Sequence, residues 1–509
     1  MTFTLRLLMI STLLAVLTSC SSAPVNTYKP KTPPAQWVEP LPFVQPHDGK
    51  LDGLTNWWQQ FNDPLLVQLI EAAQKVSPDI ESAKARVIAA QTAVTLANSQ
   101  LLPSVTADMS VSRSKGNMII PGANNFVYPA STNASIGVNA SWELDVWGKN
   151  KAAKSAELAK LSGTNALWHD ARVIVAAQTA TQYLNYRLCE KLSSIAKQNA
   201  DSTGETARLS DLTAKAGFLA PMSASQSLAQ AAEASSQQKK QALQCTLLIK
   251  SLVALTAISE PTLKEQLAKD DNSKLPMPAG VEVAAIPATL LDQRPDVLNA
   301  ERNVDAASFE IAVSDAQRYP RLSLAGNIGL TYDSYLRKFS TNRGRSDGVT
   351  WSIGPVAVSL PIFDGGLREA NLSAAKAQYE VAKSIYESVA RNAVREVEEA
   401  MATLNNAALR SDDMDKAASG FKALLDATQM RYKANLASLL ELEEARRVSL
   451  QAQANTYTLK NEQALAWISL YRAVGGGWAP ALNMPALTFD PKLKLAEPNN
   501  SVSVVSDQP

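Results

Sequence analysis

The sequence has few of the residues from which catalytic and metal centres are usually built. Among its 509 residues there are two histidines, His47 and His169, and three cysteines. Two histidines provide few candidates for a histidine-based catalytic triad or metal site. The methionines are scattered, without the clustering of a soft-metal relay, and no phosphate-binding loop or nucleotide fingerprint is present. We predict that the chain is not an enzyme and uses no metal or diffusible cofactor.

Strong net charge and long apolar segments are also missing. The formal net charge is +1 and no basic run occurs, so we expect no nucleic-acid partner. After residue 20, no stretch reaches the ~18 consecutive apolar residues that a membrane helix needs. If such a chain crosses a membrane, it must do so as a closed β-barrel, because open sheet edges leave unpaired backbone groups in lipid.

The N-terminus carries an export signal. One basic residue, Arg6, precedes a mostly apolar run over residues 7–17 that is too short to span a bilayer. The segment Leu17-Thr18-Ser19-Cys20 has the pattern of a bacterial lipoprotein box. We predict a lipoprotein signal peptide over residues 1–19 and a covalent lipid on Cys20; the alternative is a plain signal peptide with an incidental cysteine. Ser21, where an aspartate would favour the inner membrane, points to the outer membrane.

Both ends of the mature chain have the composition of loose segments. Residues 20–53 are rich in Pro, Ser and Thr and show no helical period, so we predict a lipidated N-terminal tether. Residues 481–509 are rich in Pro and Asn, which predicts a flexible C-terminal tail.

The remaining residues contain two copies of one long unit. The matching positions are Pro78 with Pro295, Pro103 with Pro320, and Gly148 with Gly365, each pair 217 residues apart (295 − 78, 320 − 103, 365 − 148). We predict an internal tandem repeat with a first unit at 54–262, a linker at 263–281 and a second unit at 282–480. Each unit reads as short helices, a strand pair and two very long helices.

Each unit supplies two predicted strands. Residues 103–114 alternate apolar and polar side chains, and residues 134–144 are their partner; 322–331 and 351–360 are the second pair. Trp142 and Trp351 lie near strand ends, where aromatic residues anchor at a bilayer interface. The alternative is two soluble hairpins. Four strands cannot close a barrel of useful width, so strands in a membrane would require several chains to share one barrel.

The long helices are the other half of each unit. Residues 148–214 and 365–434 contain no proline and are dense in Ala, Leu, Gln, Lys and Glu, and each would be roughly 100 Å long. A breaker follows each of them, and then a returning helix at 222–257 or 439–474. Leucines at spacings of three and four predict coiled-coil packing. The fold class is therefore mixed α and β, and the helices form either a rod or the wall of a tube.

Four motifs in one order resemble a known family. They are Trp57-Trp58-Gln59-Gln60-Phe61-Asn62-Asp63-Pro64, Trp142-Glu143-Leu144-Asp145-Val146-Trp147-Gly148-Lys149, Leu360-Pro361-Ile362-Phe363-Asp364-Gly365-Gly366 and Leu470-Tyr471-Arg472-Ala473-Val474-Gly475-Gly476-Gly477-Trp478. These segments look like the signatures of TolC-type outer-membrane efflux proteins, in the lipid-anchored branch that includes OprM and the NodT-like factors. The resemblance covers about residues 55–480.

The resemblance implies an assembly and its partners. The expected protein is a homotrimer whose twelve strands, four per chain, close a β-barrel among outer-membrane lipids. A coiled-coil α-helical barrel would continue it through the periplasm. A periplasmic adaptor would meet the helical tips, at Gly217 and Phe218 and at Asn435 and Leu436. Energy would come from an inner-membrane transporter of RND, MFS or ABC type.

An acidic pair just past the second breaker is a candidate gate. Matched position by position, Glu441 and Glu444 fall where the family has carboxylates that ring the closed periplasmic end. At a spacing of three they share one helix face. Rings of like charge in a narrow mouth would concentrate cations; the alternative is an ordinary solvated face. The family's usual glycine at this breaker is Asn435 here, which can still adopt the left-handed turn.

The two remaining cysteines form a possible disulfide. Cys189 and Cys245 lie on consecutive long helices, and their midpoint is residue 217, in the breaker itself. An antiparallel hairpin turning there brings both to the same height, roughly 42 Å from the tip. They bond only if both side chains point into the shared seam; the alternative is two separate buried thiols.

These observations predict a passive outer-membrane exit channel of a tripartite efflux or secretion system, exporting small molecules such as drugs. The alternative from another class is a non-conducting, periplasm-spanning structural or adhesive coiled-coil lipoprotein. The strand pairs favour the channel, because a coiled-coil rod would not require β-strands.

Overall fold

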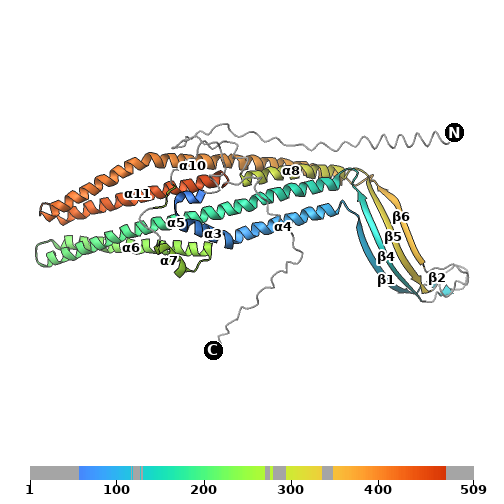
Figure 1. Cartoon of the computed structure of the whole chain (residues 1–509), viewed down its shortest axis with the longest axis horizontal. Helices are drawn as coiled ribbons and strands as arrows, with labels where there is room; N and C mark the ends of the chain where they lie inside the picture. The colour runs from blue at the N-terminus through green and yellow to red at the C-terminus, as the bar shows by residue number, and fades with distance from the viewer. Residues whose placement is uncertain are drawn as a thin grey trace, which may run out of the picture.

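The protein is an elongated molecule with a β-sheet at one end and long helices at the other, as seen in a computed structural model (Figure 1). The structure describes residues 57–115, 117–118, 126–127, 130–269, 275–278, 294–334 and 348–476. The predicted signal peptide, Cys20, the tether and the C-terminal tail lie outside these residues.

The helices are η1 (Trp57–Phe61), α3 (Pro64–Val76), α4 (Pro78–Ser99), α5 (Lys149–Lys215), α6 (Pro221–Thr256), α7 (Glu260–Lys269), α8 (Pro295–Ala316), α10 (Leu367–Lys433) and α11 (Leu439–Ala473). The strands are β1 (Ser104–Ser114), β2 (Asn117–Met118), β3 (Phe126–Val127), β4 (Ser131–Leu144), β5 (Arg321–Asp333) and β6 (Gly348–Ser359). Among the described helices, no single one is long and apolar enough to cross a membrane. Helices α6 and α7, which are bent against each other, are together long and apolar enough, by length and composition only.

Four antiparallel strands form the main sheet in the order β1-β4-β5-β6. Their register places Met109, Ile136, Leu330 and Val349 side by side in one row. Directly opposed residues share a face, so one face of the sheet is apolar and the other polar. A register shift between β5 and β6 at Leu324/Gly326 keeps the apolar residues at both ends of β6 on the same face.

Each strand of the sheet continues from, or into, a long helix in the same lateral order. Helix α4 leads to β1, β4 leads to α5, α8 leads to β5, and β6 leads to α10; the helices pack in the sequence α4-α5-α8-α10. Gly148, Gly365 and Gly366 have φ of 72°, 64° and 90° at the two points where a strand becomes a helix. Only glycine adopts such angles without cost, so these residues allow the change of backbone direction.

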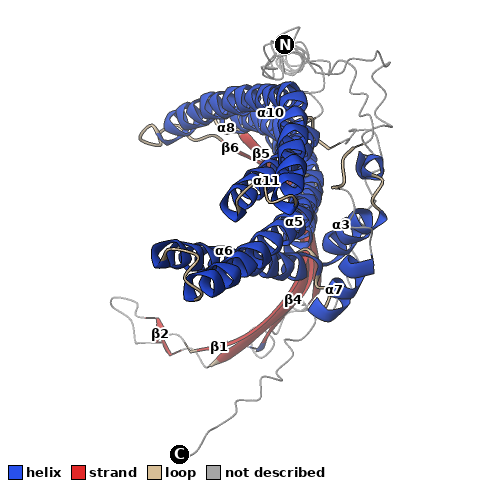
Figure 2. Ribbon diagram, turned by 90° about the vertical axis from the view of Figure 1, so that its left-hand side faces the viewer, coloured by secondary structure: helices blue, strands red, loops and turns tan. Residues whose placement is uncertain are grey.

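The far half of the molecule consists of two helical hairpins, α5 with α6 and α10 with α11. Helices α5 and α10 have 67 residues each, which corresponds to about 100 Å. Figure 2 shows that the long helices form a curved wall, with α3 and α7 on its convex side and α11 on its concave side.

The main hydrophobic core lies where the short helices η1, α3 and α7 pack on the long helices. The Trp57 ring lies 6.0 Å from that of Trp467 and 5.4 Å from that of Tyr471. Two of the four sequence motifs therefore meet here. Tilted aromatic contacts of this kind add to the burial of large apolar surfaces, so the motifs fix the start of the fold against its last helix.

The predicted linker at 263–281 contains most of helix α7. Helix α7 crosses the predicted boundary at residue 262, and Leu263 and Leu267 are buried in the main core. The spacing of four places both leucines on one face of a helix, and burial of that face holds α7 on the body. The predicted strand ends differ from the observed ends by up to three residues. The short strands β2 and β3 lie between β1 and β4 along the chain.

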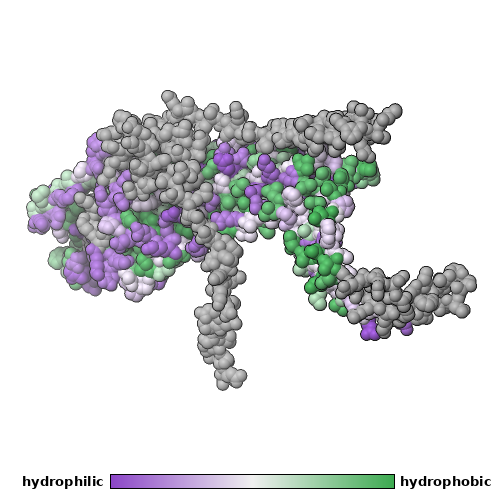
Figure 3. All heavy atoms as spheres, turned by 45° about the vertical axis from the view of Figure 1, so that its right-hand side comes forward, coloured by the Kyte–Doolittle hydropathy of each residue, from purple (hydrophilic) through white to green (hydrophobic). Residues whose placement is uncertain are grey.

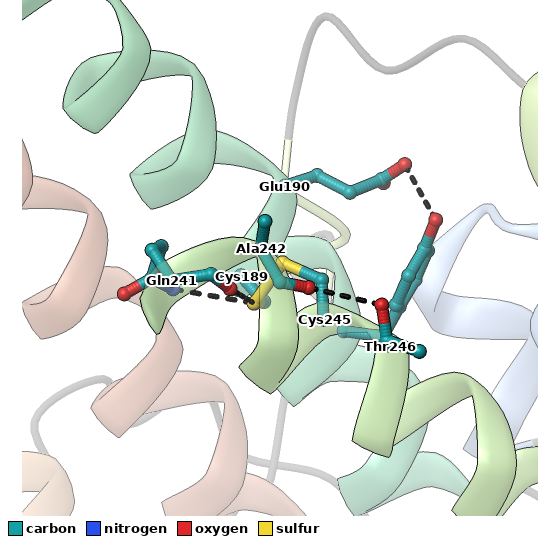
Figure 4. The surroundings of a disulfide bond; sticks show 7 residues. Cys189, Glu190, Gln241, Ala242, Cys245 and Thr246 are labelled. Atoms are coloured by element: carbon teal, nitrogen blue, oxygen red, sulfur yellow. Dashed lines mark hydrogen bonds between the residues drawn. A yellow bond between two sulfur atoms is a disulfide. The ribbon is translucent and has the colours of Figure 1, made fainter. Parts of the chain in front are cut away.

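Cys189 of α5 and Cys245 of α6 are joined by a disulfide, with their Cα atoms 5.5 Å apart (Figure 4). The side-chain amide of Gln241 donates to the Cys189 sulfur at 3.2 Å. The hairpin therefore places both cysteines at one height, as the spacing predicted. Both side chains also point into the seam between α5 and α6, which the spacing alone left open.

Loss of this disulfide should weaken the hairpin. The bond closes a loop with a sequence separation of 56. Replacement of both cysteines by serine should lower the free energy of unfolding by about 4 kcal/mol, because the unfolded chain becomes less restricted. Thermal unfolding of the variant measures this loss. Non-reducing mass spectrometry on protein taken directly from cells provides the decisive check: alkylatable thiols at both positions would contradict the bond.

Candidate channel wall and gate

The apolar face of the sheet is a broad exposed band. Its members are Val105, Met109, Val111, Ile136, Val138, Ile328, Leu330, Val349, Trp351, Ile353, Val356 and Val358. Ile353 is 79% exposed and Met109 is 76% exposed. Hydrophobic residues gather over the strands in Figure 3, whereas hydrophilic residues dominate the helical end. A contiguous band of exposed apolar side chains marks a site of contact with lipid or protein.

The opposite face of the sheet carries hydroxyl, amide and carboxylate groups. The hydroxyls of Ser104 and Ser141 lie 2.8 Å apart, and so do those of Ser110 and Ser135. The Asn139 amide donates to the Asp108 carboxylate at 2.6 Å. The two faces of the sheet therefore show the alternation of apolar and polar side chains that is expected of a membrane strand.

The two helical tips share one backbone motif. The Phe218 N–H donates to the Thr213 carbonyl at 2.9 Å, and the Leu436 N–H donates to the Arg431 carbonyl at 2.8 Å. Gly217 has φ of 81° and Asn435 has φ of 60°, so Asn435 adopts the left-handed turn that ends a helix in this way.

Each tip presents an apolar side chain to solvent. Phe218 is 85% exposed and Leu436 is 69% exposed. Behind the first tip, α5 and α6 line an open groove of about 790 Å³, and its lining includes Leu228, several alanines, Arg208, Asp211 and Lys215. Exposed apolar residues beside charged groups of both signs are typical of a protein contact surface.

The predicted gate residues Glu441 and Glu444 both lie on an exposed face of α11. Each has an arginine near it: Arg431 lies 3.9 Å from Glu441, and Arg447 lies 2.5 Å from Glu444. The hydrogen bond from Arg447 holds the pKa of Glu444 below its ordinary value. Neither arginine was predicted from the sequence, although the spacing of three between Glu444 and Arg447 was a usable signal.

A second polar cluster connects the two hairpins near the tips. The Ser202 hydroxyl of α5 lies 2.9 Å from both carboxylate oxygens of Glu443, and Arg446 donates to Glu443 at 2.6 Å. Arg446 also donates to the Ser202 hydroxyl. The Glu443 side chain is 14% exposed and that of Arg446 is 29% exposed. We call these three residues the hairpin lock. The cluster was not predictable from the sequence, because Ser202 and Glu443 are more than 200 residues apart along the chain.

A charged junction ties α8 to α10 and α11 at the middle of the molecule. The buried Arg294 guanidinium donates to Asp296 at 2.8 Å, to Glu396 at 2.9 Å and to the Ala473 carbonyl at 2.7 Å. Asp170 of α5 lies beside this group. Burial raises the pKa of Asp170 to about 6, with a further contribution from the negative charge of Asp296.

The raised pKa of Asp170 predicts a pH-dependent stability. Its folded pKa of about 6 lies above the ordinary value of 3.8. Protonated Asp170 therefore stabilises the folded state fully below about pH 4, and this contribution to the free energy of unfolding is lost as the pH rises through 6. Asp170→Asn should therefore raise the free energy of unfolding at pH 7.5 by about 3 kcal/mol. The thermal midpoint should rise accordingly, and its dependence on pH should become flatter. Asp201→Asn, on the same helix but exposed and paired with Lys197, is the control. An equal pH dependence in wild type and Asp170→Asn would contradict the prediction.

Comparisons with known proteins identify the family to which this arrangement of strands and helices belongs. The family model described as outer membrane efflux protein matches twice, at residues 69–259 and 286–476. The two matches begin 217 residues apart (286 − 69), which is the offset between the sequence repeats. The chain belongs to the outer membrane efflux protein family, as the four motifs predicted, and this is a family of channels rather than enzymes.

Individual relatives agree with this assignment. Nodulation protein T of Rhizobium leguminosarum bv. viciae is 28% identical over 83% of this chain and 84% of its own length. The solvent efflux pump outer membrane protein SrpC of Pseudomonas putida is 26% identical over 92% and 98%. The solved structure of the outer-membrane channel OprN superposes with a TM-score of 0.75 at 25% identity, over 89% of this chain and 99% of that one. The fold is therefore that of the TolC-like channels.

Proposed function

We propose that three copies of this chain form a passive exit duct through the outer membrane and the periplasm. The duct would be the outer-membrane part of a tripartite efflux system, to which the family assignment already points. The observation that carries the proposal is the matched order of strands and helices: one curved wall of four strands continues directly into one curved wall of helices.

The two lateral edges of this wall support closure by symmetry mates. In the four-stranded sheet, β1 and β6 each have one neighbour, and a strand edge in lipid must be paired. The edge helices α6 and α10 carry exposed apolar side chains, including Met222, Leu228, Leu243 and Leu247 on α6 and Leu409, Phe421, Leu424 and Met430 on α10. Twelve strands from three chains would then form a barrel, with a twelve-helix tunnel below it.

The tips are proposed to meet a periplasmic adaptor. The exposed Phe218 and Leu436 side chains and the groove between α5 and α6 support this role. An inner-membrane transporter of RND, MFS or ABC type would supply the energy through the adaptor. A lipid on Cys20 would anchor each chain to the outer membrane. The cargo is proposed as small molecules such as drugs; relatives are named for solvent efflux and for nodulation.

The gate is proposed to lie at these tips. Glu441 and Glu444 would ring the mouth on the concave side of the wall, where α11 lies. Because Arg431 and Arg447 accompany them, the ring would carry mixed charge rather than carboxylates alone. The hairpin lock would hold α11 against α5 and so keep the mouth narrow.

Conductance of the purified, lipidated protein in a planar bilayer tests the proposal. Trimeric protein should produce discrete ion-conducting channels without any nucleotide or other fuel. A stable trimer that inserts into the bilayer but never conducts, in wild type and in variants of the hairpin lock, would instead favour a non-conducting structural coiled-coil lipoprotein.

A further inference from the structure

One carboxylate stands in the middle of the polar face of the sheet. Asp108 lies at the centre of β1, and its row across the sheet is Asp108, Gly137, Gly329 and Thr350. The two glycines leave no side chain next to the carboxylate on β4 and β5. Asp108 is exposed in the chain, so its charge remains in contact with the aqueous side of the sheet.

Among the described residues, the hydrogen bonds to Asp108 all reach one carboxylate oxygen, Oδ2. The Asn139 side-chain amide donates to Oδ2 at 2.6 Å, and the Thr106 hydroxyl donates to the same oxygen at 3.4 Å. Within the described part of the chain, no lysine or arginine forms an ion pair with Asp108. The carboxylate is thus oriented by neutral donors and its negative charge is not compensated.

The other charged side chains of the strands are placed differently. Glu143 is paired with Lys149 at 2.6 Å at the helix end of β4. Arg113 and Arg321 lie at the ends of β1 and β5. Among the strand side chains that the structure describes, Asp108 is therefore the charged side chain that lies away from the strand ends.

We infer that Asp108 sets the cation preference of the membrane-spanning part of the duct. This inference rests on the proposed trimer, in which the apolar face contacts lipid and the polar face lines the lumen. Three Asp108 carboxylates then lie at one height in the barrel. A ring of fixed negative charge in a low-dielectric wall attracts cations and repels anions. The free Oδ1 atoms face metal or organic ammonium ions in transit, at a level far from the tip residues Glu441 and Glu444.

Ion selectivity of single channels provides the test. The reversal potential in a KCl gradient gives the ratio of K⁺ to Cl⁻ permeability. Asp108→Asn keeps the size of the side chain and should lower this ratio by about threefold, because three charges leave the lumen. Asp108→Glu should retain the wild-type ratio. Ser110→Asn, on the same face of the same strand, changes no charge and should leave the ratio unaltered.

A second variant keeps the test independent of the asparagine substitution. Asp108→Cys should react in the open channel with charged thiosulfonate reagents. A negatively charged reagent should restore the cation preference, and a positively charged one should reverse it. Channels of Asp108→Asn that conduct with the wild-type permeability ratio would overturn the inference while leaving the proposed duct intact. A trimer that does not conduct, either in wild type or in variants of the hairpin lock, would overturn the proposed duct and this inference together.

Discussion

Arg446→Met should open the duct. The substitution removes the hydrogen bond from Arg446 of α11 to Ser202 of α5, and the bond from Arg446 to Glu443 on its own helix, so that only the Ser202–Glu443 contact of the hairpin lock remains. It also leaves the carboxylate of Glu443, which is 14% exposed, without its cation, which costs more than the loss of an exposed pair. Separation of α11 from α5 relieves that cost by admitting water. We expect the single-channel conductance to rise by about fivefold or more.

Arg447→Met is the matched control. Arg447 is the next residue on the same helix, and its pair with Glu444 is exposed on both sides, at 64% and 57%. Exposed pairs of this kind contribute little to stability, so the control should leave the hairpin lock in place and lack the large rise in conductance. Its ion selectivity should shift toward cations, because one positive charge per chain leaves the proposed ring. Replacement of Glu441 and Glu444 by alanine should change ion selectivity more than conductance, because it removes charge and leaves the lock in place. Equal conductance of Arg446→Met and Arg447→Met would contradict the role of the lock.

Ile353→Arg should abolish insertion into the outer membrane. Ile353 lies on the apolar face of β6 and is 79% exposed. An arginine facing the middle of the bilayer costs about 2–4 kcal/mol in each chain, and a trimer carries this cost three times. We expect little heat-stable trimer in the outer membrane, measured by unboiled gel electrophoresis of membrane fractions.

The adjacent residue is a control of the opposite orientation. Ser352 points to the polar face, where its hydroxyl lies 3.1 Å from the Asn327 side-chain oxygen. Ser352→Arg should assemble into trimers and reduce conductance through the lumen. The proposed orientation of the sheet would be wrong if both variants assembled equally well. Cross-linking of native membranes that yields only monomers and dimers would contradict the trimer itself.

Most of the candidate site was predictable where it depends on local pattern. The four strands follow from alternation of apolar and polar residues, and the helix turns follow from Gly217 and from an asparagine that tolerates a positive φ. The common height of Cys189 and Cys245 follows from counting residues along two antiparallel helices. The four motifs then led to the family that the comparisons identify.

The partners of these residues were less predictable. Arg431 approaches Glu441 from a different helix, and Ser202 approaches Glu443 from a different repeat. The burial of α7 was unpredictable for a similar reason, since its leucines contact the main core only in the folded body. Propensity and spacing describe a segment by itself, whereas these contacts depend on how helices are rotated against one another.

The sequence alone therefore determined the repeat, the period of every long element and the positions of the turns, because these are encoded within a few residues of each other. Tertiary structure decided the strand order β1-β4-β5-β6, the row in which Asp108 faces two glycines, and the contact of Ser202 with Glu443. These features join residues tens to hundreds of positions apart. Their geometry follows from sheet register and helix packing, which single segments do not specify.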